Sequence, residues 1–245
     1  LQYDGGMQLA VNDQTFSHGG PGRGSEDGRE VEVGPWQAGP VRVWRRVYVD
    51  PKLGYCRWID LFQNPGDAEQ ALQRRYYSNI GEPTRAVHTS SGGDKPAQDD
   101  WGAVTGGGRT GSSRPAVVHV FAAPDADVRP RFEVAPNTDN LYYHVSLKLG
   151  PGETAGLCFF EAQRPGGAKA NALLASFDLG VELAKVPAPL RKLLVNMRGG
   201  RAATLAPVEL PRGREQDVVS LPRGRAATGT LLNETYALET AWGPM

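Results

Sequence analysis

Two carboxylates lie within apolar stretches of this sequence, and a pair of carboxylates is what glycoside hydrolysis requires. Asp60 belongs to "CRWIDLF" and Glu161 to "CFFEAQR". In that chemistry one carboxyl group protonates the leaving oxygen and the other acts as base or nucleophile, at a separation of about 5–10 Å. Ion pairs with Arg45, Arg57 or Arg74 account for both carboxylates more simply. We therefore expect no catalytic residues and no enzyme, and keep a glycoside-active enzyme as the second alternative.

Motifs of other common enzyme classes are missing from the sequence or incomplete. It contains no Gly-x-Ser-x-Gly and no His-Glu-x-x-His motif. The stretch "GGGRTGSS" (residues 106–113) invites comparison with a phosphate-binding loop, but it lacks the lysine, and Pro115 and an expected strand follow it instead of a helix. We interpret it as a surface loop and expect no bound cofactor.

The histidines show no metal-binding pattern. His18, His88, His119 and His144 include no pair at a short metal-ligand spacing. His119 and His144 lie within strand patterns. They either face each other across a sheet or, as we favour, are hydrogen-bonded residues of separate strands.

Acidic loops offer oxygen ligands for calcium, which takes about six to eight of them. Three such loops read "GGDKPAQDD", "PDAD" and "NTDN". None matches a known calcium loop, and solvated turns explain them more simply. Asp94, Asp99 and Asp100 of the first loop are the candidate metal ligands, so calcium is the one alternative to the absence of a cofactor.

Outward-facing aromatic side chains would stack on sugar rings or on a partner protein. The aromatic residues of the expected strands are Trp36, Trp44, Tyr48, Trp58, Tyr76, Tyr77, Tyr142 and Tyr143. Because alternate residues of a strand face opposite sides, about half of these rings point inward, and core packing is the default for most. Trp44, Tyr48 and Tyr142 are the candidates for an aromatic binding surface, which makes a carbohydrate-binding module the first alternative function.

The elements that position these residues are expected to be strands. The chain of 245 residues contains 31 glycines and 19 prolines, a share typical of short strands joined by many turns. Residues 41–49 and 141–149 alternate apolar and polar side chains, and residues 155–164 begin apolar on both faces, as a central strand does. Shorter candidate strands are 7–12, 29–33, 116–121 and 131–134. The expected fold is an all-β, two-sheet antiparallel β-sandwich.

The stretch "YCRWIDLFQNPGDAEQALQRRYY" is expected to form a hairpin. Trp58 and Phe62 share one face of its first strand, and Leu72 and Tyr76 share one face of its second. The "NPGD" between them has turn chemistry, because Pro presets φ, Gly tolerates positive φ and Asp bonds back to the backbone. The charged residues within the two strands would then face water or lie near a sheet edge.

Helix formers appear only after the strands. Residues 168–177 and 187–197 place leucines at helical spacing, and Gly199-Gly200 ends the second segment. We expect two short helices that cap one end of the sandwich. Residues 1–198 would then be one domain, with its helical cap at residues 167–197.

Residues 199–245 are expected to form a linker and a small C-terminal β extension. The segment "DVVSLPRGRAATGTLLNETYALETAWG" offers short strands but too few of them to fold alone. We expect it to dock on the main domain or on another chain. Its expected partner-binding residues are Val218, Leu221, Leu231, Tyr236 and Trp242.

Charge, hydropathy and cysteine content limit the partners and the compartment. The 27 basic residues balance the 27 acidic ones, which argues against a general electrostatic grip on nucleic acid or anionic lipid. No apolar run is long enough to cross a bilayer. The chain opens at Leu1 rather than Met, as a processed N-terminus would. Cys56 and Cys158 either form one disulfide in an oxidising compartment or are two buried thiols, and the sequence leaves both alternatives open.

Five segments of the sequence occur together in one order: "RRVYVDPKLGYCRWIDLFQNPGD", "YYSNIG", "TSSGGD", "LGPGETAGLCFFEAQR" and "LASFDLGVELAKVPAPLRKLLVNM". In this order they resemble bacterial extracellular or cell-surface β-sandwich modules, over residues 1–198. The extension resembles a short β motif of envelope proteins. The loop at residues 17–28 and the "GGGRTGSSRP" insertion depart from the pattern. The resemblance implies a β-sandwich in the periplasm, at the cell surface or outside the cell, and implies no activity.

Together these observations favour a non-catalytic structural or interaction module of an exported or cell-surface protein assembly. It would be an accessory subunit or a filament-type component. The expected partners are other protein subunits or further copies of this chain, with a glycan as the alternative.

Overall fold

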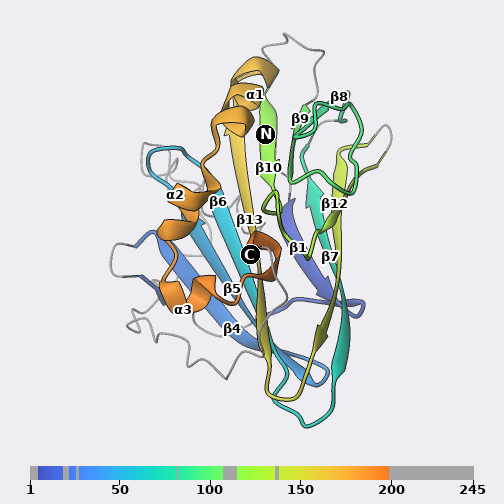
Figure 1. Cartoon of the computed structure of the whole chain (residues 1–245), viewed down its shortest axis with the longest axis vertical. Coiled ribbons are helices and arrows are strands. Elements are labelled where there is room, and N and C mark those ends of the chain that lie inside the picture. The colour runs from blue at the N-terminus through green and yellow to red at the C-terminus, as the bar shows by residue number, and fades with distance from the viewer. Residues whose placement is uncertain are drawn as a thin grey trace, which may run out of the picture.

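The computed structural model describes residues 5–18, 22–25, 28–81, 83–106, 115–135 and 138–198, which form two antiparallel sheets packed face to face (Figure 1). The five-stranded sheet has the order β11 (Arg131–Val134), β12 (Asn140–Leu149), β7 (Gln70–Asn79), β1 (Gly5–Val11) and β2 (Gln14–Thr15). The eight-stranded sheet has the order β3 (Arg23–Gly24), β4 (Glu30–Ala38), β5 (Val41–Val49), β6 (Cys56–Gln63), β13 (Thr154–Arg164), β10 (Ala116–Val120), β9 (Gly102–Gly106) and β8 (Ala86–Thr89). The fold is therefore an all-β sandwich, as the sequence predicts.

Strict alternation along the strands builds the core between the two sheets. In β12, Leu141, Tyr143 and Val145 are buried, while the residues between them are half-buried or exposed. β7 follows the same pattern, and its Leu72 and Tyr76 belong to the same core. Burying one large apolar side chain contributes about 1.5–3 kcal/mol. A shift of one residue would turn every such side chain outward, so the alternation fixes the inner face of each strand.

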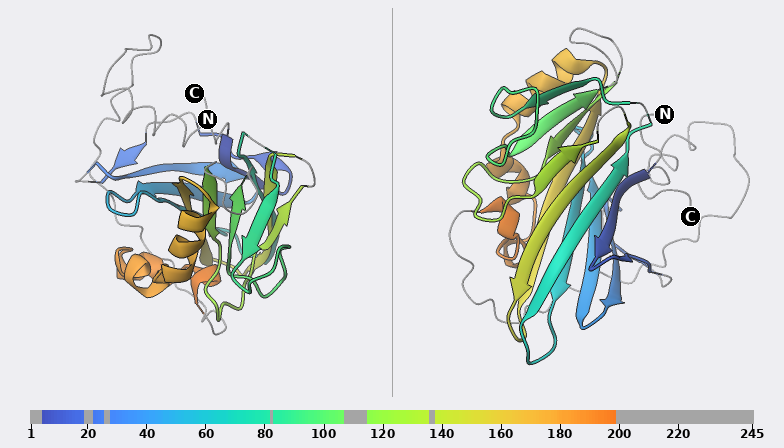
Figure 2. Two further views of the ribbon diagram at one scale, coloured as in Figure 1. Left: turned by 90° about the horizontal axis from the view of Figure 1, so that it is seen from above. Right: turned by 90° about the vertical axis from the view of Figure 1, so that its right-hand side faces the viewer.

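Three short helices lie against the outer face of the eight-stranded sheet (Figure 2). They are α1 (Gly167–Ser176), α2 (Leu179–Ala184) and α3 (Ala188–Arg191), and the 3₁₀ turn η1 (Val195–Met197) follows them. The short helices that the sequence predicts are present, and on the outer face of the sheet they form a second apolar core with β6, β13, β10 and β9. α1 matches the first predicted helix. The second predicted helix is interrupted, since a separate turn begins at η1, and α2, which the Asp178 side chain caps, is not predicted at all.

Two close contacts hold this helical layer on the sheet. Gly102 of β9 leaves no room for a side chain, because an added Cβ would lie 2.7 Å from Leu174 Cδ1 of α1. Asn196 of η1 is fully buried and accepts a hydrogen bond from the Cys158 backbone N–H at 2.9 Å. Its Nδ2 donates to the carbonyls of Cys158 and Phe121 at 2.7 and 2.8 Å. The Asn196 side chain thus satisfies three buried backbone groups at once.

The "NPGD" turn does not close a hairpin. β6 pairs with β5 and β13 in the eight-stranded sheet, whereas β7 pairs with β1 and β12 in the five-stranded sheet. The chain therefore crosses between the sheets here. The buried Asn64 side chain fixes the crossing, because its Nδ2 donates to the carbonyls of Ala68, Leu149 and Gly150 at 2.8–3.1 Å. The turn lies where the sequence predicts it, but the predicted pairing of the strands on either side of it is wrong. The same turn residues suit a hairpin within one sheet and a crossing from one sheet to the other.

The two cysteines are free thiols. Half-buried Cys56 packs against the core between the sheets, and buried Cys158 belongs to the core under the helices. The two side chains thus point to opposite faces of the same sheet. Of the two alternatives that the sequence leaves open, the structure has separate thiols and not a disulfide.

Two sequence-based predictions lie outside the described residues. They concern the C-terminal extension with Val218, Leu221, Leu231, Tyr236 and Trp242, and residues 107–113 of the "GGGRTGSS" loop. Both stay predictions. Within the described ranges, no helix has the length and apolar character needed to span a bilayer.

Candidate functional site

Asp60 lies between the two sheets and is paired with Arg45. Arg45 Nε lies 2.8 Å from Asp60 Oδ1, Nη2 lies 2.9 Å from Oδ2, and Nη1 donates to the carbonyl of Met7 at 2.6 Å. This bidentate, charge-assisted pair occupies both carboxylate oxygens. The expectation that charges within this strand face water is wrong, because Arg45 supplies the partner that makes burial of Asp60 tolerable.

Glu161 belongs to a buried hydrogen-bond network in the same interior. Glu161 Oε1 lies 3.1 Å from His119 Nδ1 and accepts from the Tyr143 hydroxyl at 3.0 Å. That hydroxyl also lies 2.8 Å from His119 Nδ1, and Thr105 Oγ1 lies 2.8 Å from His119 Nε2. His119 is therefore a hydrogen-bonded strand residue, as predicted. His144 points out of the other sheet and does not face it.

Both carboxylates are buried in the interior of the sandwich. Asp60 is 0% and Glu161 is 6% exposed, and neither lines either of the two surface hollows described below. Their oxygens are engaged with Arg45, His119 and Tyr143. These contacts join β5 to β6 and β13 to β10 within the eight-stranded sheet, and Met7 and Tyr143 connect them to the other sheet.

Trp44 and Tyr48, two of the three aromatic candidates, lie on the helix side of the eight-stranded sheet. Both pack against the core under the helices. The Arg57 guanidinium lies 4.5 Å from the ring centre of Tyr48 and donates to Glu30 Oε1 at 3.0 Å. These rings are thus used in packing, and of the three candidates only Tyr142 belongs to the outer side of the five-stranded sheet.

The outer face of the five-stranded sheet carries the polar residues that alternate with the core, and no described element covers it (Figure 2). Because β11, β12, β7 and β1 pair in register, these side chains form rows across the sheet. The row that we call the aromatic row consists of Glu133, Tyr142, Tyr77 and Gln8. The row that we call the cationic row consists of Arg131, His144 and Arg75. The two rows lie two residues apart along the strands, about 7 Å.

The aromatic row is built around two tyrosines that stand directly opposite each other. The ring centres of Tyr77 and Tyr142 are 5.5 Å apart and their planes are inclined at 41°. Both side chains are half-buried, so part of each ring is open to solvent. The Tyr77 hydroxyl donates to Asn140 Oδ1 at 3.0 Å, and Asn79 Nδ2 donates to the same oxygen at 3.2 Å. These bonds hold the Tyr77 ring in place beside a pair of amides.

The cationic row contains more positive than negative charge. Arg131 Nη1 donates to Glu133 Oε2 at 2.9 Å, and His144 Nε2 lies 3.5 Å from the same oxygen. No described carboxylate pairs with Arg75. Burial, followed by the Arg131 guanidinium, lowers the pKa of His144, with Arg75 acting in the same direction and Glu133 against it. Near neutral pH the cationic row therefore holds two guanidinium charges and a neutral imidazole, and the one carboxylate beside it is Glu133 of the aromatic row.

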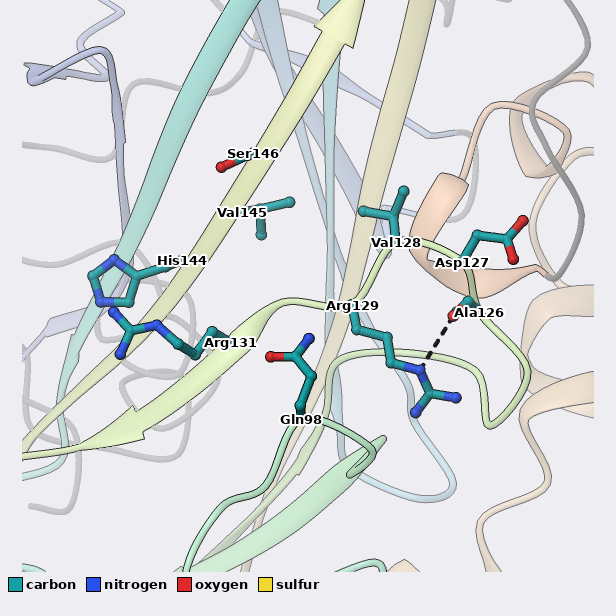
Figure 3. A pocket seen from close by; sticks show the side chains of 9 residues that line it. All are labelled: Gln98, Ala126, Asp127, Val128, Arg129, Arg131, His144, Val145 and Ser146. Carbon is teal, nitrogen blue, oxygen red and sulfur yellow. Dashed lines mark hydrogen bonds between the residues drawn. The ribbon is translucent and has the colours of Figure 1, made fainter.

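Two hollows border these rows. The smaller, of about 180 Å³, is lined by Tyr77, Tyr142 and Arg75 together with residues of β1 and β2. The larger, of about 480 Å³, lies beside β12 where β11 no longer pairs with it, and is lined by Arg131 and His144 among others (Figure 3). Both hollows thus contain an arginine and at least one residue of the rows.

Arg129 builds the wall of the larger hollow. Its guanidinium donates to the backbone carbonyls of Ala126 at 3.2 Å and Asp99 at 2.6 Å, and to that of Pro124. In Figure 3 the Arg131 and His144 side chains lie side by side, and the Asp127 carboxylate lies on the far side of Arg129 from them. Arg129 therefore orders the loop, while Arg131 and His144 are the groups at the end of the hollow nearest the rows.

The calcium candidates lie elsewhere and do not converge. Asp100 is buried and accepts from the backbone N–H groups of Ser91 at 2.9 Å and Ala97 at 2.8 Å. Burial raises the pKa of Asp100, but these hydrogen bonds outweigh it, so the net shift is downward. Asp94 and Asp99 are exposed. Among the described residues no three His, Cys, Asp or Glu side chains are grouped to hold a metal ion, and Asp100 serves its own loop.

Sequence reasoning finds Tyr142 but not the rows around it. Arg75 and Tyr77 are two residues apart in one strand, as are Tyr142 and His144 in another, so the sequence does indicate that each pair shares a face. The pairing of β7 with β12, which joins the pairs into one surface, is not readable from the sequence.

Comparison with known proteins assigns no family. No protein-family model and no curated protein matches the sequence. Among solved structures, a polysaccharide lyase is similar over 71% of this chain and 28% of its own, with 17% identity and a TM-score of 0.44. A heparinase III is similar over 66% of this chain and 24% of its own, with 10% identity and a TM-score of 0.42. A GH36 α-galactosidase from Geobacillus stearothermophilus is similar over 67% of this chain and 30% of its own, with 9% identity and a TM-score of 0.41. This chain spans less than a third of each of these three proteins.

Proposed function

We propose that this chain is a non-catalytic interaction module of an exported or cell-surface protein assembly, and that the outer face of its five-stranded sheet is the contact surface. One observation carries the proposal. The carboxylates buried between the sheets, Asp60 and Glu161, are engaged with Arg45, His119 and Tyr143, whereas the aromatic and cationic rows are open on a face that no described element covers.

The composition of this face supports a role in binding. Tyrosine and arginine are the residue types that most often dominate the energetics of binding surfaces. Tyr77 is held by Asn140, and Arg131 by Glu133, before any partner arrives. Preorganised side chains lose little conformational entropy on binding, so more of the contact energy appears as affinity.

Hydrogen exchange measured with and without candidate protein and glycan partners tests the proposal. We expect slowed exchange along β7 and β12 on binding and no product from any glycan of the panel. Replacing both tyrosines (Tyr77→Ser, Tyr142→Ser) should weaken the contact. The matched control is Val181→Ser, because Val181 is 55% exposed on the helix side of the molecule.

Two results would contradict the proposal. One is slowed exchange confined to α1–α3 with β7 and β12 unchanged, which would place the contact on the other face. The other is turnover of a glycan that disappears in the Asp60→Asn or Glu161→Gln variant, which would make the module an enzyme.

A further inference from the structure

We propose that the outer face of the five-stranded sheet binds an acidic oligosaccharide, a chain of sugar rings that carry carboxylate groups. The rings would lie on Tyr77 and Tyr142, and a carboxylate would pair with Arg75 and Arg131 beside His144. This inference rests on the proposed contact face and names the chemical class of its ligand.

The aromatic row fits a sugar ring. A pyranose ring has C–H groups on its faces and hydroxyls at its edge, so it needs an apolar platform surrounded by hydrogen-bonding groups. Tyr77 and Tyr142 supply a platform of two half-buried rings whose centres are 5.5 Å apart. Asn79 and Asn140 border it on one side, and Gln8 extends the same row. Neutral amides both donate to and accept from hydroxyls.

The cationic row fits a carboxylate on that ring. It runs parallel to the aromatic row at about 7 Å, within reach of a ring substituent. Arg75 has no described carboxylate partner, and guanidinium groups bind carboxylates with two parallel hydrogen bonds. Arg131 shares Glu133 with His144, so it retains further N–H donors. A neutral sugar would leave this excess of positive charge uncompensated.

The extent of the face fits several sugar rings rather than one. The rows cross β11, β12, β7 and β1, and three spacings between neighbouring strands make about 14 Å. One hollow adjoins the row at the β1 end and the other at the β11 end, and each contains an arginine. A chain molecule lying across the strands would therefore meet positive charge on both sides of the tyrosine pair.

His144 gives the site an expected pH dependence. The groups around it are Arg131 on β11, Arg75 on β7 and Glu133, and the Tyr142 ring lies 6.1 Å from its own ring. Burial, and then the two arginines, disfavour the imidazolium form in the free protein. A bound carboxylate would favour it, so binding should take up a proton and tighten as the pH falls from 7.5 to 5.5.

Isothermal titration of the full chain with a galacturonic acid tetrasaccharide tests the inference. The same tetrasaccharide with all carboxylates methyl-esterified provides the neutral ligand. We expect measurable binding of the acid and a loss of at least about tenfold with the ester. Arg75→Met and Tyr142→Ala should each weaken binding of the acid by about tenfold or more, and His144→Gln should abolish the pH dependence.

Lys148→Met is the matched control. Lys148 is a cation on the outer face of the same sheet, two rows beyond His144, with an exposed side chain. Its removal should change the affinity less than about twofold. All substitutions are at side chains that point to solvent from paired strands, and thermal unfolding of each variant shows whether it is folded.

Each other outcome overturns the inference in a distinguishable way. Equal binding of the acid and the ester would refute the acidic class and leave the proposed contact face intact. Binding of a poly-glutamate peptide as tight as that of the sugar, or no binding of any acidic sugar tested, would point to a protein partner for the same face. Binding unaffected by Arg75→Met and Tyr142→Ala would place the ligand elsewhere and contradict both proposals.

Discussion

Arg45 and Asp60 form a bidentate ion pair inside the sandwich, with nitrogen–oxygen distances of 2.8 and 2.9 Å and side chains that are 7% and 0% exposed. The pair joins β5 to β6, and the bond from Arg45 to the Met7 carbonyl extends it to β1 in the opposite sheet. The bond to Met7 is a polar link between the two sheets, because a slip of one sheet on the other would leave the Met7 carbonyl and Arg45 Nη1 buried without partners.

Arg45→Met should destabilise the chain by about 3–5 kcal/mol, because it leaves the Asp60 carboxylate buried without a partner. Urea unfolding followed by tryptophan fluorescence measures the change. The control is Lys148→Met, which breaks an exposed pair with Glu69 at 3.7 Å and should cost about 0–1 kcal/mol. Similar losses in the two variants would show that the interior pair has no special role.

Arg74→Met should leave the stability unchanged or raise it by about 1–4 kcal/mol. Arg74 is 2% exposed, and its Nε and Nη1 have no acceptor among the described residues. Only Nη2 donates, to the carbonyls of Leu72 and Val145. Burial lowers the pKa of Arg74 to about 10, because the charged guanidinium is poorly solvated inside the protein. Arg45→Met is the matched comparison, and a loss as large as in that variant would mean that Arg74 has an anionic partner.

The contact between α2 and the end of β5 should weaken in acid. Lys185 Nζ lies 2.8 Å from Asp50 Oδ2 and 2.5 Å from Glu182 Oε2, and Tyr55 donates to Glu182 as well. Burial raises the pKa of Asp50, but hydrogen bonds from Lys185 and from the backbone of Leu53 lower it by more, so the net shift is downward.

Because the pKa of Asp50 is lower in the folded state, its ionised carboxylate stabilises the fold at pH values above its unfolded-state pKa of about 3.9. This contribution is lost as the pH falls through the pKa of Asp50 in the folded state. The difference in unfolding free energy between the unmodified chain and Asp50→Asn should thus be constant from pH 8 to about pH 5 and shrink in more acidic buffer. Urea titrations at several pH values measure it. A difference that grows on acidification would refute the assignment.

Both cysteines should be inert until the chain unfolds. Burial raises the pKa of Cys158 to about 12 and raises that of Cys56 as well, so neither carries much thiolate near pH 8. Ellman's reagent should react with them slowly in buffer and completely in urea. A reducing agent should leave the melting temperature unchanged. Rapid labelling of the folded chain, or a lower melting temperature in dithiothreitol, would contradict this.

Period-two alternation in the sequence predicts the strands and their inner faces well. Residues 41–49 form β5 with the predicted bounds, and the alternating stretch at 141–149 lies within β12. Alternation also places Arg45 on the same face of β5 as the buried Val43 and Val47. A charged residue on a buried face breaks the apolar pattern, and the sequence does not show which residue compensates its charge. The partner Asp60 lies on another strand, and only the paired structure shows that the two charges meet.

Strand pairing is where the sequence fails, for the fold and for the site alike. The turn after β6 would look the same in a hairpin, and only the contacts of Asn64 distinguish the two arrangements. The aromatic row depends on Tyr77 standing opposite Tyr142, residues that lie far apart in the chain. Trp44 has the same sequence signature as Tyr142, and only the helices packed on its side of the sheet separate the two.

The position of β13 also limits when the sandwich can form during synthesis on the ribosome. Among the described residues it is the last strand to emerge, yet it lies between β6 and β10 in the centre of the eight-stranded sheet. Until Thr154–Arg164 has been synthesised, a growing chain has two half-sheets with open edges and nothing to join them. The nascent protein must therefore keep these two half-sheets unfolded, or shielded by chaperones, until β13 has left the ribosome, while the helices and residues 199–245 are still to follow.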